Sequence, residues 1–342
     1  MQVSFGALRR KEPTLTTIPL EPIDSVTITM LMDNSSDMLL QSQGPANRPS
    51  LSGDNARVAT RFLENGEVRN SLIAEHGFSA HVAVTKGEYA HRILFDAGVS
   101  PNGVVENMRR LELSPKNIET MVMSHGHFDH TVGLDGLTNA LGGTVNLPVM
   151  IHPEFWSRRR IAIPGRSPSE LPATSKPALV GAGFEIIENR QPSFLLDGSV
   201  LVTGEVDRTT EFETGFPVHQ AFHDEGGWQP DPLILDDQAL VMNVRDKGLV
   251  VLTGCGHSGI VNIVHYAKKL TGVDDVYAVL GGFHLSGPIF EPIIRATTQA
   301  LAALNPRHIV PAHCTGYKAV HALAAAMPDA FIQNSVGTRF EF

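Results

Sequence analysis

The sequence predicts an α/β (α+β) fold in which two β-sheets pack face to face and helices cover both outer faces, a four-layer αββα sandwich. Short segments rich in Val, Ile and Leu recur along the chain and have the length of buried strands. Each half of the chain runs through a meander of strands and then a β-α-β unit. Because such a pair of sheets cannot be divided in sequence, we expect one domain at residues 24–342, preceded by an N-terminal arm at residues 1–23.

The first half begins with the segment SVTITMLM at residues 25–32, whose β-branched residues favour a strand. Residues 33–70 hold Asn, Ser, Gly and Pro without sustained periodicity, which predicts a long surface loop. The apolar run at 120–123 leads directly into SHGHFDH. The other expected elements are strands at 81–85, 92–95 and 149–151, a helix at about 101–112 and a short helix from near Thr131.

The second half repeats this order, and its apolar runs are equally short. Two stretches interrupt the pattern, at 153–178 and 204–232, and we expect both to be loop insertions that carry substrate contacts. The expected elements are strands at 184–187, 200–203, 239–244, 249–252, 276–280 and 308–310, and helices at 260–270, 292–304 and 317–326.

The composition disfavours several classes of protein. The chain has a formal net charge of −9. This disfavours a nucleic-acid-binding protein, which needs a basic stripe to neutralise phosphates. No run reaches the roughly 18 uninterrupted apolar residues of a membrane span. Two cysteines, Cys255 and Cys314, make no disulfide framework and fit a reducing compartment. We therefore expect a cytoplasmic protein whose partner is neither nucleic acid nor a membrane.

The segment HGHFDH at residues 125–130 carries the strongest chemical signal. Residues at i and i+2 of an extended backbone project to one side, so His125 and His127 can hold the same metal ion. As the chain turns into the next helix, Asp129 and His130 can face a neighbouring position. Imidazole and carboxylate groups are ligands of zinc, iron and manganese. A merely solvated loop is the alternative, and three His with one Asp in six residues after an apolar strand argue against it.

Four ligands on one loop cannot complete one or two metal shells, so later residues must converge on them. Three further strands end in GCGH, GFH and PAHC, and strand ends of one sheet meet at one edge. At these ends His257 and His313 are favoured as ligands, and His284 is open between ligand and core residue. Cys255 is either a thiolate ligand or a small core residue.

Residues around these strand ends have supporting roles in this prediction. Asp96, at the end of another strand, is expected to orient a ligand histidine or to hold the loop. Cys314 is expected in the core, because free cysteines are commonly buried. The remaining histidines are expected on the surface or packed inside, with His219 and His223 as the exceptions on a loop near this edge.

These motifs resemble the metallo-β-lactamase superfamily, an αββα sandwich: HGHFDH after a strand, FDAG upstream and a late His at a strand end. The resemblance covers about residues 24–342. Several further blocks resemble the archaeal 7,8-dihydropterin-6-methyl-4-(β-D-ribofuranosyl)aminobenzene 5′-phosphate synthases and their bacterial relatives. Among these blocks are Asp33-Asn34, EHGFS at 75–79, DDQAL at 236–240 and TGCGHSGIVN at 253–262.

The resemblance implies one or two divalent metal ions, with zinc expected and manganese, magnesium or iron also compatible. The chain departs from the superfamily at two places: Cys255 stands where hydrolases have a metal-bridging Asp, and Asp236-Asp237 stands where a third histidine is usual. The expected ligands are His125, His127, Asp129, His130, His257 and His313, and the residues expected in catalysis are Asp129 and His284.

The resemblance also implies a transferase that joins a dihydropterin methyl diphosphate to a ribofuranosylaminobenzene phosphate and expels diphosphate. Asn34, Arg208 and Cys255 are the expected substrate contacts, and the loop at 33–70 is expected to cover the site. The arginines at 158–160 and 166 either clamp phosphate or form a solvated basic loop. Two alternatives stay open: a metal-dependent hydrolase of a phosphoester, lactone or thioester, and a non-catalytic scaffold that binds a small molecule. The sequence indicates no oligomeric state.

Overall fold

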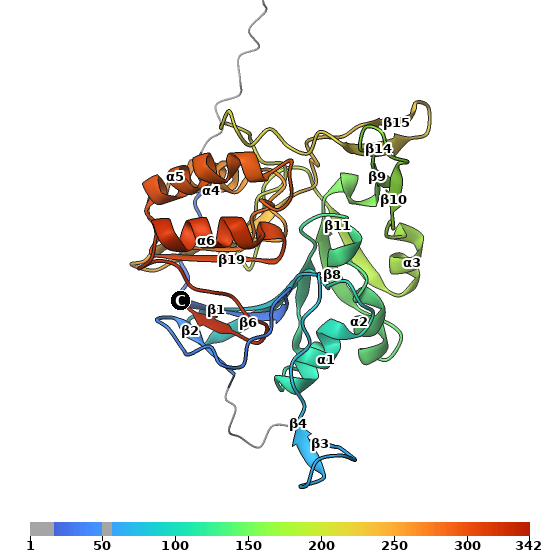
Figure 1. The fold of residues 1–342 in the computed structure, drawn as a ribbon, viewed down its shortest axis with the longest axis vertical. Helices are drawn as coiled ribbons and strands as arrows, with labels where there is room; N and C mark the ends of the chain where they lie inside the picture. Colours follow the sequence, from blue (N-terminus) through green and yellow to red (C-terminus); the bar gives the residue numbers. More distant parts are fainter. Residues whose placement is uncertain (1–16, 50–56) are drawn as a thin grey trace, which may run out of the picture.

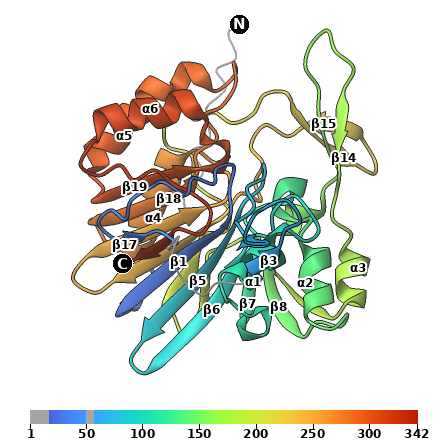
Figure 2. The same cartoon turned by 60° about the horizontal axis from the view of Figure 1, so that its bottom comes forward.

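Two β-sheets lie face to face in the computed structural model, which describes residues 17–49 and 57–342 (Figures 1 and 2). Helices from the first half of the chain cover one outer face, and helices from the second half cover the other. The predicted αββα sandwich is therefore confirmed. Of the expected N-terminal arm, residues 1–16 lie outside the described part of the chain.

The first sheet has eight strands and is parallel on one side and antiparallel on the other. Parallel pairing joins β6, β7, β8 and β11, and antiparallel pairing joins the rest. In pairing order the strands are β11 (Phe184–Glu188), β8 (Leu147–Ile151), β7 (Thr120–Val122), β6 (Tyr89–Phe95), β5 (Ser79–Lys86), β1 (Ser25–Met32), β20 (Arg339–Glu341) and β2 (Ala46–Asn47).

The second sheet has six strands in an equivalent arrangement. Its last three strands pair in parallel through helical crossovers, so their carboxyl ends point to the same edge. In pairing order the strands are β12 (Ser193–Leu195), β13 (Val200–Val202), β16 (Ala239–Val244), β17 (Gly248–Thr253), β18 (Val276–Gly282) and β19 (His308–Ala312).

Alternate residues of each strand separate the central core from the outer layers. Val250 and Leu252 of β17 face the first sheet, whereas Leu249 and Val251 pack under α4.

None of the described helices is long and apolar enough to cross a membrane. The helices are α1 (Gly103–Arg110), α2 (Leu134–Ala140), α3 (Lys176–Gly181), α4 (Ile260–Thr271), α5 (Ile294–Leu304) and α6 (Tyr317–Ala326).

Both insertions of the second half were expected to be loops, and this expectation is wrong. They pair with each other in a third, four-stranded antiparallel sheet: β10 (Ser169–Leu171), β9 (Arg159–Ile161), β14 (His219–His223) and β15 (Gly227–Pro230). The Arg160 guanidinium lies 4.5 Å from the centre of the Trp228 ring, so aromatic and cationic side chains support these polar strands. Short strands without an apolar alternation leave no periodic signal in the sequence.

The stretch at 33–70 also differs from a plain loop. It holds β2 and a hairpin of β3 (Arg57–Ala59) and β4 (Glu67–Arg69), with residues 50–56 outside the described part. The hairpin projects at the bottom of Figure 1, away from the β14–β15 ribbon at the top. Among the described residues of this stretch, Asp33 and Asn34 reach the end of β19, where both bond to the backbone of His313.

Two leucines in different environments allow a test of which residues form the core. Leu252 is fully buried between the sheets, whereas Leu63 of the hairpin segment is half exposed. We expect Leu252→Ala to lower the free energy of unfolding by about 2–5 kcal/mol, because it leaves a cavity in the core. Urea denaturation of both variants measures this, and Leu63→Ala should change the stability by less than about 0.5 kcal/mol. Equal losses in the two variants would contradict the assignment of the core.

Candidate metal centre

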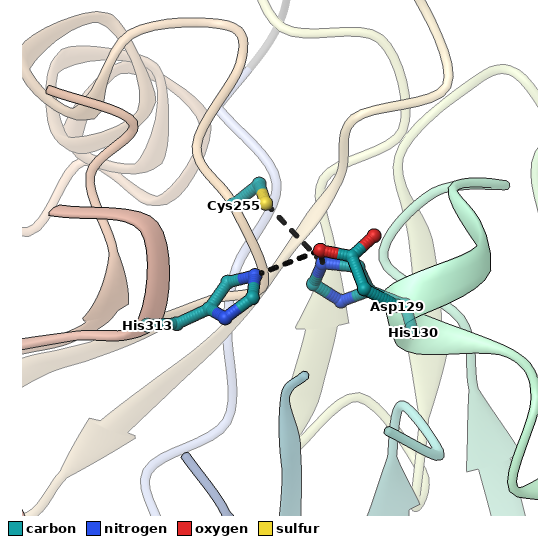
Figure 3. Close-up of side chains that lie close together, drawn as sticks. All are labelled: Asp129, His130, Cys255 and His313. Atoms are coloured by element: carbon teal, nitrogen blue, oxygen red, sulfur yellow. Dashed lines mark hydrogen bonds and ion pairs between the residues drawn. The ribbon is translucent and has the colours of Figure 1, made fainter. Parts of the chain in front are cut away.

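Five strands end at one edge of the sandwich, and each is followed by a polar side chain that points into the same place. The strands β6 and β7 come from the first sheet, and β17, β18 and β19 come from the second. Side chains from both sheets meet there, as Figure 3 shows for four of them. The structure thus brings together the six ligand candidates and Cys255: His125, His127, Asp129, His130, His257, His313 and Cys255.

One end of this cluster holds Asp129, His130, Cys255 and His313, whose ligand atoms all lie within 4.8 Å of one another. Nε2 of His130 lies 3.2 Å from Sγ of Cys255, and Nε2 of His313 lies 3.3 Å from Oδ2 of Asp129 (Figure 3). Asp129 and His130 belong to a short 3₁₀ turn at 128–130. This set of donors contains imidazole, carboxylate and thiol groups, which suits a divalent ion such as zinc.

The other end of the cluster consists of histidines. His125, Cys255 and His257 place their ligand atoms within 4.8 Å of one another. Nε2 of His125 lies 3.0 Å from Nδ1 of His127, and Nε2 of His127 lies 3.1 Å from Nε2 of His219. Nδ1 of His219 lies 2.9 Å from the carbonyl oxygen of Asp231, to which it can donate. That bond leaves the lone pair of Nε2 facing the cluster.

Cys255 is common to both ends. A third group, of Cys255, His284 and Cys314, also has ligand atoms within 4.8 Å. Burial, and then the neighbouring Cys314, raises the pKa of the Cys255 thiol, so a thiolate here requires a cation beside it. Cys255 is 3% exposed and lies at the common point of all three groups, which favours the thiolate-ligand interpretation over a plain core residue. Its expected contact with substrate stays a prediction.

A buried carboxylate positions the first-sheet part of the cluster. Asp96 accepts hydrogen bonds from the backbone N–H of Ser124 and from its hydroxyl, both at 2.7 Å, and its Oδ2 lies 2.7 Å from Nδ1 of His130. The residue has a φ of +59°, an uncommon conformation that aspartate tolerates better than most residues. Nδ1 of His130 is therefore occupied, and its Nε2 faces Cys255 and Asp129.

The charges differ between the two ends. Burial, followed by the neighbouring imidazoles, lowers the pKa values of His125 and His257 well below the usual range, which keeps their lone pairs free. Burial raises the pKa of Asp129, but His130 and His313 more than offset this and leave it well below the usual value. Burial by itself lowers the pKa of His130, but the neighbouring carboxylates of Asp96 and Asp129 outweigh this effect and raise the pKa to about 9.

Unpartnered buried nitrogens show that the cluster fits a metal ion. Within the described residues, neither ring nitrogen of His257 has a hydrogen-bond partner. Burying such polar atoms without a partner costs on the order of 1–3 kcal/mol each. A divalent cation coordinated by these residues removes that cost, whereas a scaffold that binds no metal keeps it. The donor set and the unpartnered nitrogens therefore both indicate a metal ion.

Asp236 and Asp237, which stand where a third histidine is usual, have protein donors beside them in the structure. Asp236 pairs with the Arg159 guanidinium at 2.6 Å and accepts the Gly126 N–H at 2.8 Å. Asp237 accepts the N–H of Ser258, and burial raises its pKa to about 6. In the described part of the chain, neither aspartate belongs to a metal-sized group of side chains. His219 instead lies beside His127, because β14 pairs with β9 and brings it there.

Two of the expected substrate contacts support ligand candidates in this structure. Asn34 donates to the carbonyl oxygen of His313 at 2.9 Å, and its Oδ1 lies 3.3 Å from Nδ1 of that histidine. Arg208 donates to the carbonyl oxygen of His257 at 3.2 Å and to that of Leu233. Both side chains therefore border the cluster and bond to the backbone that carries it.

The arginines of the first insertion have partners of their own. Arg159 is buried against Asp236, and Arg158 lies 3.2 Å from Glu170. Arg160 donates to the amide oxygen of Gln220 at 2.7 Å, and Arg166 is exposed. The partners of Arg158 and Arg160 and the exposure of Arg166 favour a solvated surface for these three arginines, whereas the buried Arg159 fits neither interpretation.

Gly126 allows the HGHFDH loop to pass close to the chain after β8. A Cβ atom at this position would lie 2.0 Å from the carbonyl oxygen of Phe155, far inside contact distance. Gly254 has the same role between the sheets, because its Cβ would lie 2.1 Å from Oγ of Ser124. Close approach of backbones, more than turn geometry, requires glycine at both positions.

Comparison with known proteins places this site in context. Residues 81–268 match the Metallo-beta-lactamase superfamily. The chain is 30% identical over 292 residues to the 7,8-dihydropterin-6-methyl-4-(β-D-ribofuranosyl)-aminobenzene-5′-phosphate synthase of Methanocaldococcus jannaschii, covering 84% of this chain and 97% of the archaeal enzyme. An uncharacterized protein of the same archaeon is 31% identical over 282 residues, with 81% and 97% covered. The crystal structure of Tm1679, a metal-dependent hydrolase of the β-lactamase superfamily, shares the fold with a TM-score of 0.67 at 22% identity, covering 93% of this chain and 99% of that one.

The position of His219 generates a prediction about metal binding. We expect His219→Ala to weaken zinc binding by roughly tenfold to a hundredfold, because it removes a nitrogen that faces His127. His223→Ala is the matched control, since this histidine lies on the same strand but is exposed. Competition of each variant with a chromogenic zinc chelator measures the affinities. Unchanged affinity in His219→Ala would show that this histidine is only packed against the cluster.

The raised pKa of His130 predicts how the stability of the metal-free protein depends on pH. A pKa of about 9 in the folded state exceeds the unfolded value of about 6.5, so the stabilisation is fully present below pH 6.5 and is lost as the pH rises toward 9. We expect the difference in unfolding free energy between chelator-treated wild type and His130→Gln to fall by about 2 kcal/mol between pH 6.5 and 8.5. Urea denaturation of both proteins across this range measures this difference, and His223→Gln should follow the wild-type profile.

Proposed function

The chain belongs to the metallo-β-lactamase superfamily, and on this basis we propose that it is a metal-dependent transferase. It couples a 7,8-dihydropterin methyl diphosphate to a ribofuranosylaminobenzene phosphate and releases diphosphate. The archaeal relative named for this product covers most of the chain. In this reaction the carbon–oxygen bond to diphosphate breaks, a carbon–nitrogen bond forms, and the aryl amine loses one proton.

The metal is held by side chains from both sheets. A bound divalent cation supplies Lewis-acid chemistry, which stabilises the negative charge that develops on the departing diphosphate. Asp129 remains charged at neutral pH and balances that cation, while Cys255 lies between the two ends. In this proposal the ligands of one or two divalent ions are drawn from His125, His127, His219, His257, Asp129, His130, Cys255 and His313.

The observation that supports the coupling reaction is that two separate recesses lie near the cluster, one bordered by His257 and His284 and the other by His313. A pocket of about 120 Å³ is lined by His257 and His284. A wider recess of about 510 Å³ lies beside His313 and Asn34. A hydrolase of one substrate needs a single recess and a water molecule, whereas a coupling enzyme must hold two organic molecules next to the same metal. Two recesses therefore favour coupling over hydrolysis.

His284 is the proposed acceptor of the amine proton. It lines the smaller pocket, and its ring centre lies 4.1 Å from that of His257. Its Nδ1 is buried without a hydrogen-bond partner among the described residues, so no protein group competes for that nitrogen. A φ of +44° turns the backbone at the end of β18 so that this side chain reaches the cluster.

The test is a coupled assay with both substrates and zinc-loaded protein. We expect diphosphate and the coupled product to form in a one-to-one ratio. Asp129→Asn should lower kcat by roughly a hundredfold or more, because it removes the charge that balances the cation. Asp135→Asn, an exposed aspartate of α2, is the matched control and should retain wild-type turnover.

Other outcomes of this assay would contradict the proposal in distinct ways. Diphosphate release without coupled product would indicate a hydrolase. Absence of turnover, with both substrates bound, would leave a non-catalytic binding scaffold. Equal activity of the zinc-loaded and chelator-treated protein would contradict the requirement for a metal.

A further inference from the structure

The smaller pocket next to His284 has an aromatic wall, and we propose that it binds a single six-membered aromatic ring carrying a neutral amine. This inference rests on the proposed function, in which it assigns the aryl amine to this end of the cluster and leaves the bicyclic pterin to the other. The pocket is lined on its apolar side by Phe212, Phe283, Leu285, Ile289, Phe290 and Ile293.

The aromatic wall comes from two separate segments of the chain. The ring centre of Phe290 lies 4.4 Å from that of His284, and the planes are nearly perpendicular, at 83°. Phe216, from the second insertion, supports both from behind at 5.1 and 5.7 Å. Edge-to-face contacts at such distances are the favoured arrangement of aromatic rings, so an additional ring finds compatible partners here.

The size of the pocket selects one ring over two. Its volume is about 120 Å³, and an apolar protein cavity of about 150 Å³ holds one benzene molecule. A fused bicyclic ring exceeds this space. The recess beside His313, at about 510 Å³, has room for the larger molecule.

The charge of the pocket selects a neutral group over an anion. Glu213 lines the pocket, and its two carboxylate oxygens accept the N–H groups of Val261 and Asn262 at 3.0 and 2.9 Å. The N-terminus of α4 is thus already neutralised by a protein carboxylate and offers no phosphate site. A phosphate group on the same molecule must therefore remain at the mouth of the pocket, while the amine points toward His257 and His284.

The test uses 4-methylaniline as the probe and calorimetric titration of zinc-loaded protein as the measurement, without turnover. Ile289 borders the pocket and is 37% exposed, so Ile289→Trp fills the pocket without disturbing the core. We expect this variant to weaken binding of 4-methylaniline by at least about tenfold. Ile187→Trp is the matched control, because Ile187 on β11 is 39% exposed and far along the chain from the pocket; it should bind as the wild type does.

A competition experiment tests the selection for one ring. We expect 6-hydroxymethylpterin to leave the affinity for 4-methylaniline unchanged, since the two rings occupy different recesses. Displacement of 4-methylaniline by the pterin, undetectable binding of 4-methylaniline, or equal binding by Ile289→Trp and wild type would each overturn the inference.

The two proposals fail in distinguishable ways. If 4-methylaniline binds and Ile289→Trp weakens it, but the coupled assay forms no product, only the proposed function is contradicted. If the coupled product forms and Ile289→Trp leaves the KM for the aryl amine unchanged, only the assignment of the pocket is contradicted.

Discussion

The buried contact between Asp96 and His130 is the interaction on which the rest of the site depends. It fixes the orientation of an imidazole whose other nitrogen lies 3.2 Å from Cys255, a residue of the opposite sheet. The same carboxylate holds the backbone at Ser124, directly before the HGHFDH loop. Gly254 packs against this pair with no space for a side chain. Asp96 therefore connects the ends of both sheets, and a change there would displace ligands of both.

The rest of the fold must stabilise this site, because burying its polar groups costs free energy. The cluster buries several imidazoles, two carboxylates and a thiol, and three of its residues, Asp96, His284 and His313, have positive φ values. Burial of polar groups is unfavourable unless each one finds a partner. The apolar layer between the sheets, together with the layers under the helices, supplies the opposing stabilisation. A metal ion bound here would satisfy one ring nitrogen of His257, which protein groups do not reach.

The asymmetry of the cluster relates its structure to the proposed chemistry. One end combines a charged carboxylate, Asp129, with His130 and His313, and the other end is built from neutral imidazoles. A different recess lies near each end, a wide one beside His313 and a narrow aromatic one beside His284. Cys255 lies where the two ends meet, so a single thiol influences both. This arrangement matches a reaction in which one molecule loses an anionic group while another contributes a neutral amine.

The sequence by itself determined the elements and the ligands that depend on local order. Short runs rich in Val, Ile and Leu predicted most strands of both sheets, though not β2, β12 and β20. The spacing in HGHFDH predicted that His125 and His127 lie on one side of the backbone. The positions of His257 and His313 followed from a general rule, because parallel strands of one sheet end at the same edge. In each of these cases the residue's place within or at the end of its own strand, which the sequence shows, decides where it lies.

Only the tertiary structure decided the role of residues whose position depends on pairing between distant segments. His219 reaches the cluster because β14 of one insertion pairs with β9 of the other, and these short polar strands have no periodicity to predict them. Asp236 and Asp237 stood at a plausible ligand position, yet Arg159 binds Asp236, and the N–H of Ser258 binds one oxygen of Asp237. The other oxygen of Asp237 has no hydrogen-bond partner among the described residues. A carboxylate bonds to the donors that surround it in space, and for these two residues the donors are contributed by segments far away in the sequence.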